Sequence, residues 1–163
     1  MAVDMFLKID GIKGESQDHK HGGEIDVLAW SWGMSQSGTT HTGGGGGSGK
    51  VSVQDLSFTK YVDSASHALM INCSKGQHIN EATLYVRKAA GKEPIEYIKL
   101  TMKEIIVSSI STGGSGGEDR LTENITLNFA QYKYEYTPQK ADGSPDATKI
   151  ATWNIAKNTE KLG

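Results

Sequence analysis

The most obvious candidate for chemistry in this sequence is a glycine-rich run that ends in lysine. Gly44 to Lys50 follows the phosphate-binding pattern G-x-x-x-x-G-K-[ST] up to the lysine. In that pattern, backbone N–H groups and the lysine hold phosphates at the start of a helix. Here the next residue is Val51, which has no hydroxyl for magnesium, and the following residues alternate like a strand. Nucleotide binding is therefore not expected. A β-barrel module that binds a small ligand with the 43–49 loop remains an alternative to a protein that works by contact with other subunits.

Histidine and carboxylate side chains form no pattern for metal binding or hydrolysis. His19 and His21 are a lone H-x-H pair without a third ligand at zinc spacing. Glu118 and Asp119 are adjacent, so in a strand their carboxylates would point apart, which does not suit general acid–base catalysis. No nucleophile motif such as G-x-S-x-G occurs. We therefore predict no catalytic residue, no metal ligand and no cofactor, and a protein that is not an enzyme.

Composition and charge restrict the protein class further. The 163 residues are 36% apolar and 22% charged, which is typical of one soluble domain. The net charge of −2 has no basic stripe for nucleic acid, and the single cysteine, Cys73, excludes an internal disulfide. The first ten residues lack the basic region of a signal peptide, and no apolar run is long enough to cross a membrane. We expect a cytoplasmic protein that does not insert into membranes.

Strand patterns dominate the chain. We expect strands at residues 3–9, 24–36, 51–62, 81–89, 95–110, 121–136 and 149–156. One helix is expected at residues 64–75, with Asp63 as its N-cap and Gly76 at its end. The sequence therefore predicts a single, mainly all-β domain over residues 1–163, a β-barrel or sandwich with one short α-helix on its outside.

Two of the expected strands change their apolar face midway. In residues 51–62 the change predicts a bulge or bend near Asp55. In residues 121–136 the apolar positions are odd-numbered as far as Phe129 and then continue as even-numbered tyrosines. Such a change is expected at the corner of a closed barrel or where one sheet passes into another.

The strand at residues 24–36 has two unlike faces. The bulky face, expected to be core, contains Asp26, Leu28, Trp30, Trp32 and Met34. The small face, expected to point outward, contains Ile25, Val27, Ala29, Ser31 and Gly33. Exposed apolar surface costs about 25 cal/mol per Å². We therefore expect the small face to be covered by another subunit, to line an enclosed space, or to lie under the helix of the same chain.

Two loops are candidates for contact with a neighbouring subunit. The first contains His41, Thr42, Gly43, Gly44, Gly45, Gly46, Gly47, Ser48, Gly49 and Lys50. Ordering so many glycines is entropically costly, and docking to a neighbour would offset that cost. The second, glycine-rich at 113–117, is expected to connect two long strands as a hairpin. It continues into Glu118, Asp119 and Arg120, which are candidate interface charges, with a solvated turn as the alternative.

Four long segments of the chain carry a family resemblance. They are residues 1–9, 24–38, 53–61 and 111–130, and the second contains the run Leu28-Ala29-Trp30-Ser31-Trp32-Gly33-Met34-Ser35-Gln36. The segments agree in order and extend over nearly the whole chain. In these segments the chain resembles the haemolysin-coregulated protein (Hcp) family of the bacterial type VI secretion system.

The resemblance implies a fold, an assembly and a set of partners. The implied fold is a two-sheet β-barrel with one flanking helix. Members of this family form homohexameric rings with a central channel, and the rings stack into the inner tube of a contractile machine. The implied partners are other copies of the chain, a VgrG-type spike, a contractile sheath and small effector proteins in the channel. The implied location is cytoplasmic before firing, with later secretion through the type VI machinery without a cleaved signal peptide.

The resemblance also gives roles to the candidate residues. The small face of residues 25–33 would lie toward the channel or the neighbouring subunit, with Ser31 in contact with cargo. The loop at 41–50 would reach an adjacent subunit or the next ring.

Overall fold

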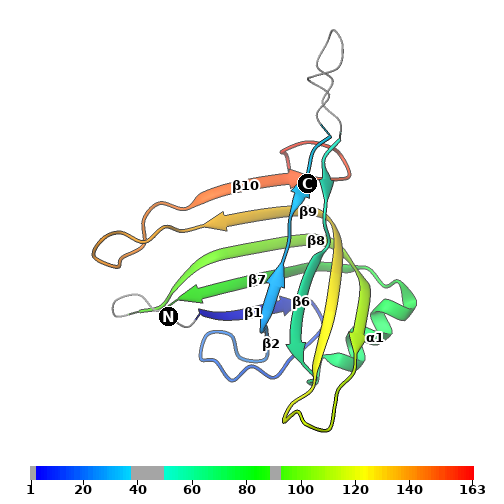
Figure 1. Ribbon diagram of the computed structural model, residues 1–163. Coiled ribbons are helices and arrows are strands. Elements are labelled where there is room, and N and C mark those ends of the chain that lie inside the picture. The colour runs from blue at the N-terminus through cyan, green and yellow to red at the C-terminus, as the bar shows by residue number, and fades with distance from the viewer. Residues whose placement is uncertain (1–2, 38–49, 89–92) are drawn as a thin grey trace.

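The computed structural model describes residues 3–37, 50–88 and 93–163, which form ten strands and one helix. In chain order the elements are β1 (Val3–Ile9), β2 (Ile25–Asp26), β3 (Ala29–Ser31), β4 (Met34–Ser35), β5 (Ser52–Val53), β6 (Leu56–Tyr61), α1 (Ser66–Lys75), β7 (Ile79–Lys88), β8 (Ile95–Thr112), β9 (Thr122–Tyr136) and β10 (Lys149–Asn154). Figure 1 labels most of them on the ribbon. Within the described ranges, no helix has the length and apolar character needed to cross a membrane.

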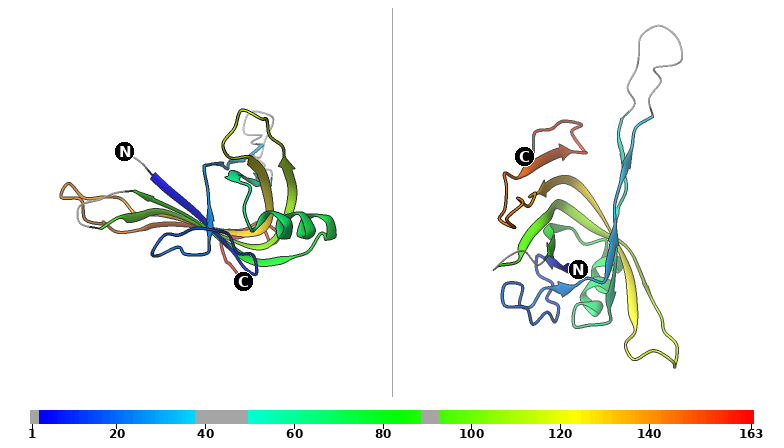
Figure 2. Two further views of the ribbon diagram at one scale, coloured as in Figure 1. Left: turned by 90° about the horizontal axis from the view of Figure 1, so that it is seen from below. Right: turned by 60° about the vertical axis from the view of Figure 1, so that its left-hand side comes forward.

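One eight-stranded antiparallel sheet curls until its two ends meet. Its order is β2-β1-β7-β8-β9-β6-β3, with β10 paired to β9. The end strands β2 and β3 are consecutive in the chain. The N–H of Val27 donates to Met5 O on β1 (2.9 Å), and the next N–H, of Leu28, donates to Thr59 O on β6 (2.8 Å). The segment from β2 to β3 therefore leaves one edge of the sheet and joins the other, which closes the sheet into a barrel (Figure 2).

This change of partner corrects the prediction for residues 24–36. They form three short strands rather than one long strand. Ile25 and Val27, predicted to point outward, are core residues at 0% and 6% exposure. Leu28 and Met34, predicted to be core, are 39% and 45% exposed. The alternation shifts where the chain passes from β1 to β6, so one uninterrupted period of two does not apply.

Strand β9 changes its buried face where its neighbour changes. Its first half pairs with β6 as far as Leu127, and its second half pairs with β10 from Gln131 onward. Phe129 is the last buried odd-numbered apolar residue, and Tyr132 is the first buried tyrosine. The corner predicted for residues 121–136 is confirmed. The bend near Asp55 is confirmed too, because it separates β5 from β6.

Strand β8 turns the same corner beside β9. Met102 and Ile105 are both fully buried, so two outward residues stand between them. One of these is Glu104, whose φ of 56° lies in the left-handed region. A side chain in this region is strained, and such residues occur at bends and bulges. The corner of the barrel is therefore built by a local change of backbone conformation in β8.

The corner divides the sheet into two arms. We call β3, β6, residues 122–127 of β9 and residues 106–112 of β8 the front arm. We call β1, β7, residues 95–105 of β8, residues 131–136 of β9 and β10 the wing. Figure 2 shows the wing extending to one side of the barrel. The mainly-β barrel with one flanking helix is confirmed. Its two arms belong to one sheet and are continuous through β8 and β9.

The helix α1 agrees closely with the sequence prediction. It spans Ser66–Lys75, so it begins two residues later than predicted and ends where predicted, with Gly76 in the left-handed conformation at φ 62°. Asp63 is not the cap residue, but its Oδ1 accepts a hydrogen bond from the N–H of Ala65 (2.9 Å). Leu69 and Ala65 are fully buried, so α1 adds its apolar side to the barrel core.

A buried ion pair fixes the start of α1. Lys60 Nζ lies 2.9 Å from Glu123 Oε2 and 2.7 Å from Asp63 Oδ1, and the Lys60 and Glu123 side chains are 0% and 1% exposed. Ser66 donates from its hydroxyl to Glu123 Oε2 (2.8 Å). An unpaired buried charge would be strongly destabilising. These contacts therefore hold α1 against β6 and β9.

A two-stranded ribbon, β4 with β5, leaves the barrel above the front arm. Trp32 anchors its base: the indole N–H donates to Gln54 O (2.9 Å), and the ring meets the Tyr132 ring edge-on at 4.8 Å between centroids. The Tyr132 hydroxyl in turn lies 3.7 Å from Met34 Sδ. The aromatic contacts connect the ribbon to the second half of β9.

The corner in β8 predicts a position-specific effect on stability. Glu104→Val places a β-branched residue at positive φ and is expected to lower the free energy of unfolding by about 1 kcal/mol more than the control does. The control is Lys103→Val, because Lys103 is the neighbouring exposed residue. Urea denaturation followed by tryptophan fluorescence measures both. Equal losses in the two variants would contradict the assignment of strain to Glu104.

Candidate functional site

A row of hydroxyl groups crosses all four strands of the front arm. Ser31 on β3 is opposite Ser57 on β6, and Ser57 is opposite Thr126 on β9. Thr126 in turn is opposite Ser109 on β8. All four side chains are on the outward face, because the large apolar residues of these strands occupy the alternate positions and face the core.

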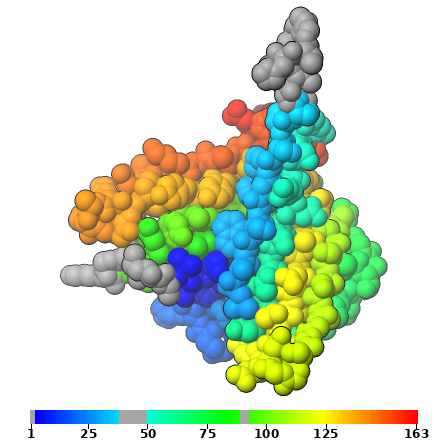
Figure 3. Space-filling view, in the orientation of Figure 1, coloured from blue at the N-terminus to red at the C-terminus, as the bar shows by residue number. Residues whose placement is uncertain are grey.

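A second row lies parallel to the first. It runs from Ala29 on β3 through Thr59 and Asn124 to Ser111 on β8. The Thr59 hydroxyl donates to Asn124 Oδ1 (2.7 Å). In the space-filling view the four strand segments lie side by side on one surface of the molecule (Figure 3).

We call this surface the hydroxyl face. It comprises Ala29, Ser31, Asp55, Ser57, Thr59, Ser108, Ser109, Ser111, Asn124, Thr126 and Asn128. Asp55 is its only charged member. Its two carboxylate oxygens accept hydrogen bonds from the Ser108 hydroxyl (2.6 Å) and from Asn128 Nδ2 (2.8 Å). The carboxylate thus reaches across β9 to β8.

The chemistry available on the hydroxyl face is hydrogen bonding rather than bond cleavage. Its side chains are short, so a polypeptide can approach the sheet closely, and ordering them costs little side-chain entropy. Hydroxyl and amide groups offer many weak polar contacts without a deep pocket. Such a surface suits reversible contact with another protein.

The structure distributes the predicted outward residues over three places. Ala29 and Ser31 lie on the hydroxyl face and are exposed. Gly33 lies at the base of the ribbon, where its carbonyl accepts a hydrogen bond from the N–H of Gln54 (2.9 Å). Ile25 and Val27 lie in the core, so their predicted outward role is wrong. The change of strand partner described above is the physical reason.

The two predicted loops have different outcomes. Residues 41–49 lie outside the described residues, while Lys50 is exposed just before β5. The 113–117 loop connects β8 to β9 as a hairpin, as predicted. Glu118 and Asp119 are exposed there, and the Arg120 guanidinium lies 3.7 Å from the centroid of the Tyr61 ring in the same chain. An interface role for these three charges stays a prediction.

Sequence reasoning missed most of the hydroxyl face. Ser57, Thr126 and Ser109 were not singled out, although a signal was present in two of the three strands. In residues 56–59 and 124–129 small polar residues alternate with large apolar ones. The pattern indicates a half-buried strand, but it does not tell which strands are neighbours.

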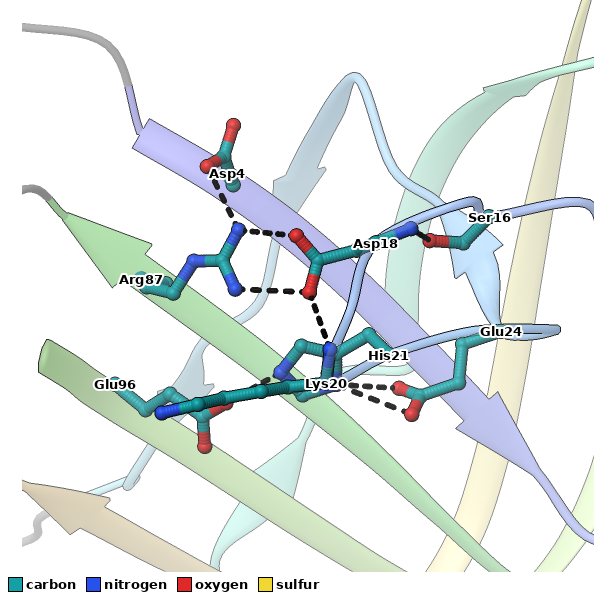
Figure 4. Close-up of polar contacts among 8 residues, drawn as sticks. All are labelled: Asp4, Ser16, Asp18, Lys20, His21, Glu24, Arg87 and Glu96. Carbon is teal, nitrogen blue, oxygen red and sulfur yellow. Dashed lines mark hydrogen bonds and ion pairs between the residues drawn. The ribbon is translucent and has the colours of Figure 1, made fainter. Parts of the chain in front are cut away.

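A second polar cluster joins the 10–24 loop to the wing (Figure 4). Arg87 on β7 holds the Asp18 carboxylate with two hydrogen bonds, of 2.9 Å from Nη1 and 2.6 Å from Nη2. Nη2 also donates to Asp4 on β1 (3.1 Å). The hydrogen bonds from Arg87 hold the pKa of Asp18 well below its usual range. The loop is therefore attached by a bidentate ion pair.

His21 forms the other half of the same cluster. Its Nδ1 lies 3.0 Å from Glu24 Oε1, and its Nε2 contacts the Glu96 carboxylate on β8. The ring is buried and stacks on Phe6 with 4.4 Å between centroids. In the parts of the chain that the structure describes, no three His, Cys, Asp or Glu residues are arranged to hold a metal ion. The cluster attaches the 10–24 loop to the wing, and His21 contributes through its contacts with Glu24 and Glu96.

The family model and the similar proteins all belong to type VI secretion systems or carry the name Hcp. The family model described as "Type VI secretion system effector, Hcp" matches residues 6–136. Protein hcp1 of Pseudomonas aeruginosa is 62% identical over 161 residues, which cover 98% of this chain and 99% of that protein. A solved structure of a type six secretion system protein has a TM-score of 0.90 at 30% identity and covers 97% of this chain and 99% of that one. Hcp1 from Salmonella typhimurium has a TM-score of 0.79 at 43% identity, covering 97% and 98%.

The Arg87–Asp18 pair predicts a stability effect that depends on pH. Because the pKa of Asp18 is lowered on folding, its contribution is present above the ordinary value of 3.8 and is lost as the pH falls below it. Asp18→Asn is expected to lower the free energy of unfolding by about 1–3 kcal/mol at pH 7. The difference from the unmodified protein is expected to shrink below pH 4.

Urea denaturation between pH 7 and pH 3 measures this effect. Asp26→Asn, at an exposed carboxylate on β2, is the control and is expected to change little at any pH. A stability loss in Asp18→Asn that stays constant down to pH 3 would count against the ion pair as its cause.

Proposed function

Since this chain belongs to the Hcp family of type VI secretion effectors, we propose that it is a ring-forming subunit of the type VI inner tube. In this proposal the ring is a homohexamer, the rings stack, and the hydroxyl face lines the channel. The observation that carries the proposal is that the hydroxyl face lies between two strand edges without a strand partner.

One of these edges is β3, which in the described chain pairs only with β6. The other is the second half of β8. The pairing of β7 with β8 ends at Ile105, so residues 106–112 have only β9 as a strand partner among the described residues. Unpaired strand edges are templates for pairing with another chain. Because the two edges differ, contact between them would be head-to-tail, and a head-to-tail contact forms a closed ring when the rotation closes.

The hydroxyl face supports a second part of the proposal. A channel that releases its contents needs a surface without deep pockets or long adhesive side chains, and short hydroxyl residues meet that need. We propose that small effector proteins in the channel contact this face and that Ser31 is one contact. The further proposed partners are a VgrG-type spike, a contractile sheath and, through the 41–50 loop, an adjacent subunit or ring. The protein would be cytoplasmic before firing and exported without a cleaved signal peptide.

The ring proposal predicts the size of the particle in solution. Light scattering on the purified protein is expected to give a mass near six times the chain mass of 17.5 kDa. Negative-stain images are expected to show rings, or tubes where rings stack. A clean monomer at high protein concentration would sink the proposal.

The channel proposal predicts an effect of side-chain length at Ser31. Ser31→Gln places a longer side chain on the hydroxyl face and is expected to reduce the amount of effector that co-purifies with the ring, without changing ring mass. Ser74→Gln, at an exposed serine of α1, is the matched control. Quantitative mass spectrometry of the purified rings measures retention. Unchanged retention of every effector in Ser31→Gln would remove Ser31 from the channel contacts.

The small-ligand alternative makes a separate prediction. It requires saturable nucleotide binding that is lost on Lys50→Ala. A flat calorimetric titration with ATP and magnesium would end it.

A further inference from the structure

The hydroxyl groups around Asp55 form a continuous chain of short contacts. Ser108 donates its only hydroxyl proton to Asp55 Oδ2 (2.6 Å). The Ser108 oxygen also lies 2.7 Å from the Thr126 hydroxyl. The Thr126 oxygen in turn lies 2.6 Å from the Ser109 hydroxyl. Asp55 in the bend before β6 is thus connected in one line with Ser108 and Ser109 on β8 and Thr126 on β9.

The ionised carboxylate fixes the direction of every hydrogen bond in this line. A carboxylate accepts and a hydroxyl has one proton to donate. Because the Ser108 proton is used by Asp55, Thr126 must donate to Ser108. Because the Thr126 proton is then used, Ser109 must donate to Thr126. The reverse direction would leave two oxygens in short contact with no proton between them.

The direction of these bonds determines what the surface offers to a ligand. The three hydroxyl protons point along the sheet toward Asp55 and are all used in these hydrogen bonds. The lone pairs of the three hydroxyl oxygens remain available on the outward side. Asn128 spends one of its two amide N–H bonds on the same carboxylate. The three hydroxyls beside Asp55 therefore present acceptors, next to a negative charge.

We propose that Asp55 is a specificity-determining residue that orients these hydroxyls and makes the face select cargo surfaces rich in hydrogen-bond donors and positive charge. Lysine, arginine and amide groups are the matching chemistry, and carboxylate-rich surfaces are disfavoured. The proposal rests on the proposed channel role of the hydroxyl face. In a ring of identical subunits the preference is repeated at every copy, which strengthens it because the potentials of like charges add.

The test uses two fluorescent peptides with blocked ends, pentalysine and pentaglutamate, as probes of charge. Binding to the purified full-length protein is followed by fluorescence anisotropy at low salt. The unmodified protein is expected to bind pentalysine at least about tenfold more tightly than pentaglutamate, and Asp55→Asn to reduce that ratio to about threefold or less. Asp26→Asn removes the same charge outside the hydroxyl face and is expected to keep the ratio of the unmodified protein.

A second variant tests the orientation of the hydroxyls themselves. Thr126→Val keeps the shape of residue 126 and every charge, but it frees the Ser109 proton. Pentaglutamate is expected to bind about two- to fivefold more tightly to Thr126→Val than to the unmodified protein, because the freed hydroxyl now donates outward. If Asp55→Asn does not fold, Thr126→Val still tests the orientation of the hydroxyls. If Asp55 had only a structural role, Thr126→Val would not change pentaglutamate binding.

Two results would overturn the inference: an unchanged ratio in Asp55→Asn, or an equal change in Asp26→Asn. Unchanged pentaglutamate binding in Thr126→Val would overturn the orientation of the hydroxyls. Light scattering of each sample separates these failures from failure of the ring. A monomeric protein contradicts the proposed ring, while the peptide ratios still test Asp55 on the exposed face of the monomer.

Discussion

The structure depends on one constraint, which is that the backbone groups along both edges of β9 must be paired. On one edge β8 accompanies β9 over nearly its whole length, but on the other edge β6 covers only the first half and β10 the second. An unpaired backbone in the middle of a sheet is costly. The corner of the barrel therefore coincides with the place where one neighbour ends and the next begins. The front arm and the wing exist because β9 has two successive neighbours on that edge.

The same corner separates surfaces of different chemistry. On the front arm most outward residues are short and polar, while on the wing the outward residues include the longer charged side chains of Lys99, Lys133 and Glu135. Because β8 and β9 run through both arms, one continuous core supports both surfaces. The buried Lys60–Glu123 pair and the Arg87–Asp18 pair then fix α1 and the 10–24 loop to this core.

Much of the fold follows from local patterns in the sequence. The phase change after Phe129, the glycine after α1 and the hairpin at 113–117 each have a local cause and were predictable. Ile25 and Val27 were assigned to the wrong face because their burial depends on which strand lies beside them. The hydroxyl face was missed for a related reason. Ser31, Ser57, Thr126 and Ser109 are adjacent only through cross-strand register, and alternation within one strand carries no information about register.

The segment that closes the barrel has a consequence for the order of folding. Residues 25–31 pair with β1, near in sequence, and with β6, about thirty residues later, while β6 itself needs β9 from far along the chain. Closure must therefore wait for contacts of long sequence separation, which form slowly. Until then both edges that the segment joins are open, and β3 has no fixed position. A chain that is still folding lacks the complete hydroxyl face and its bounding edge, so only a finished domain offers the surface that another copy would pair with.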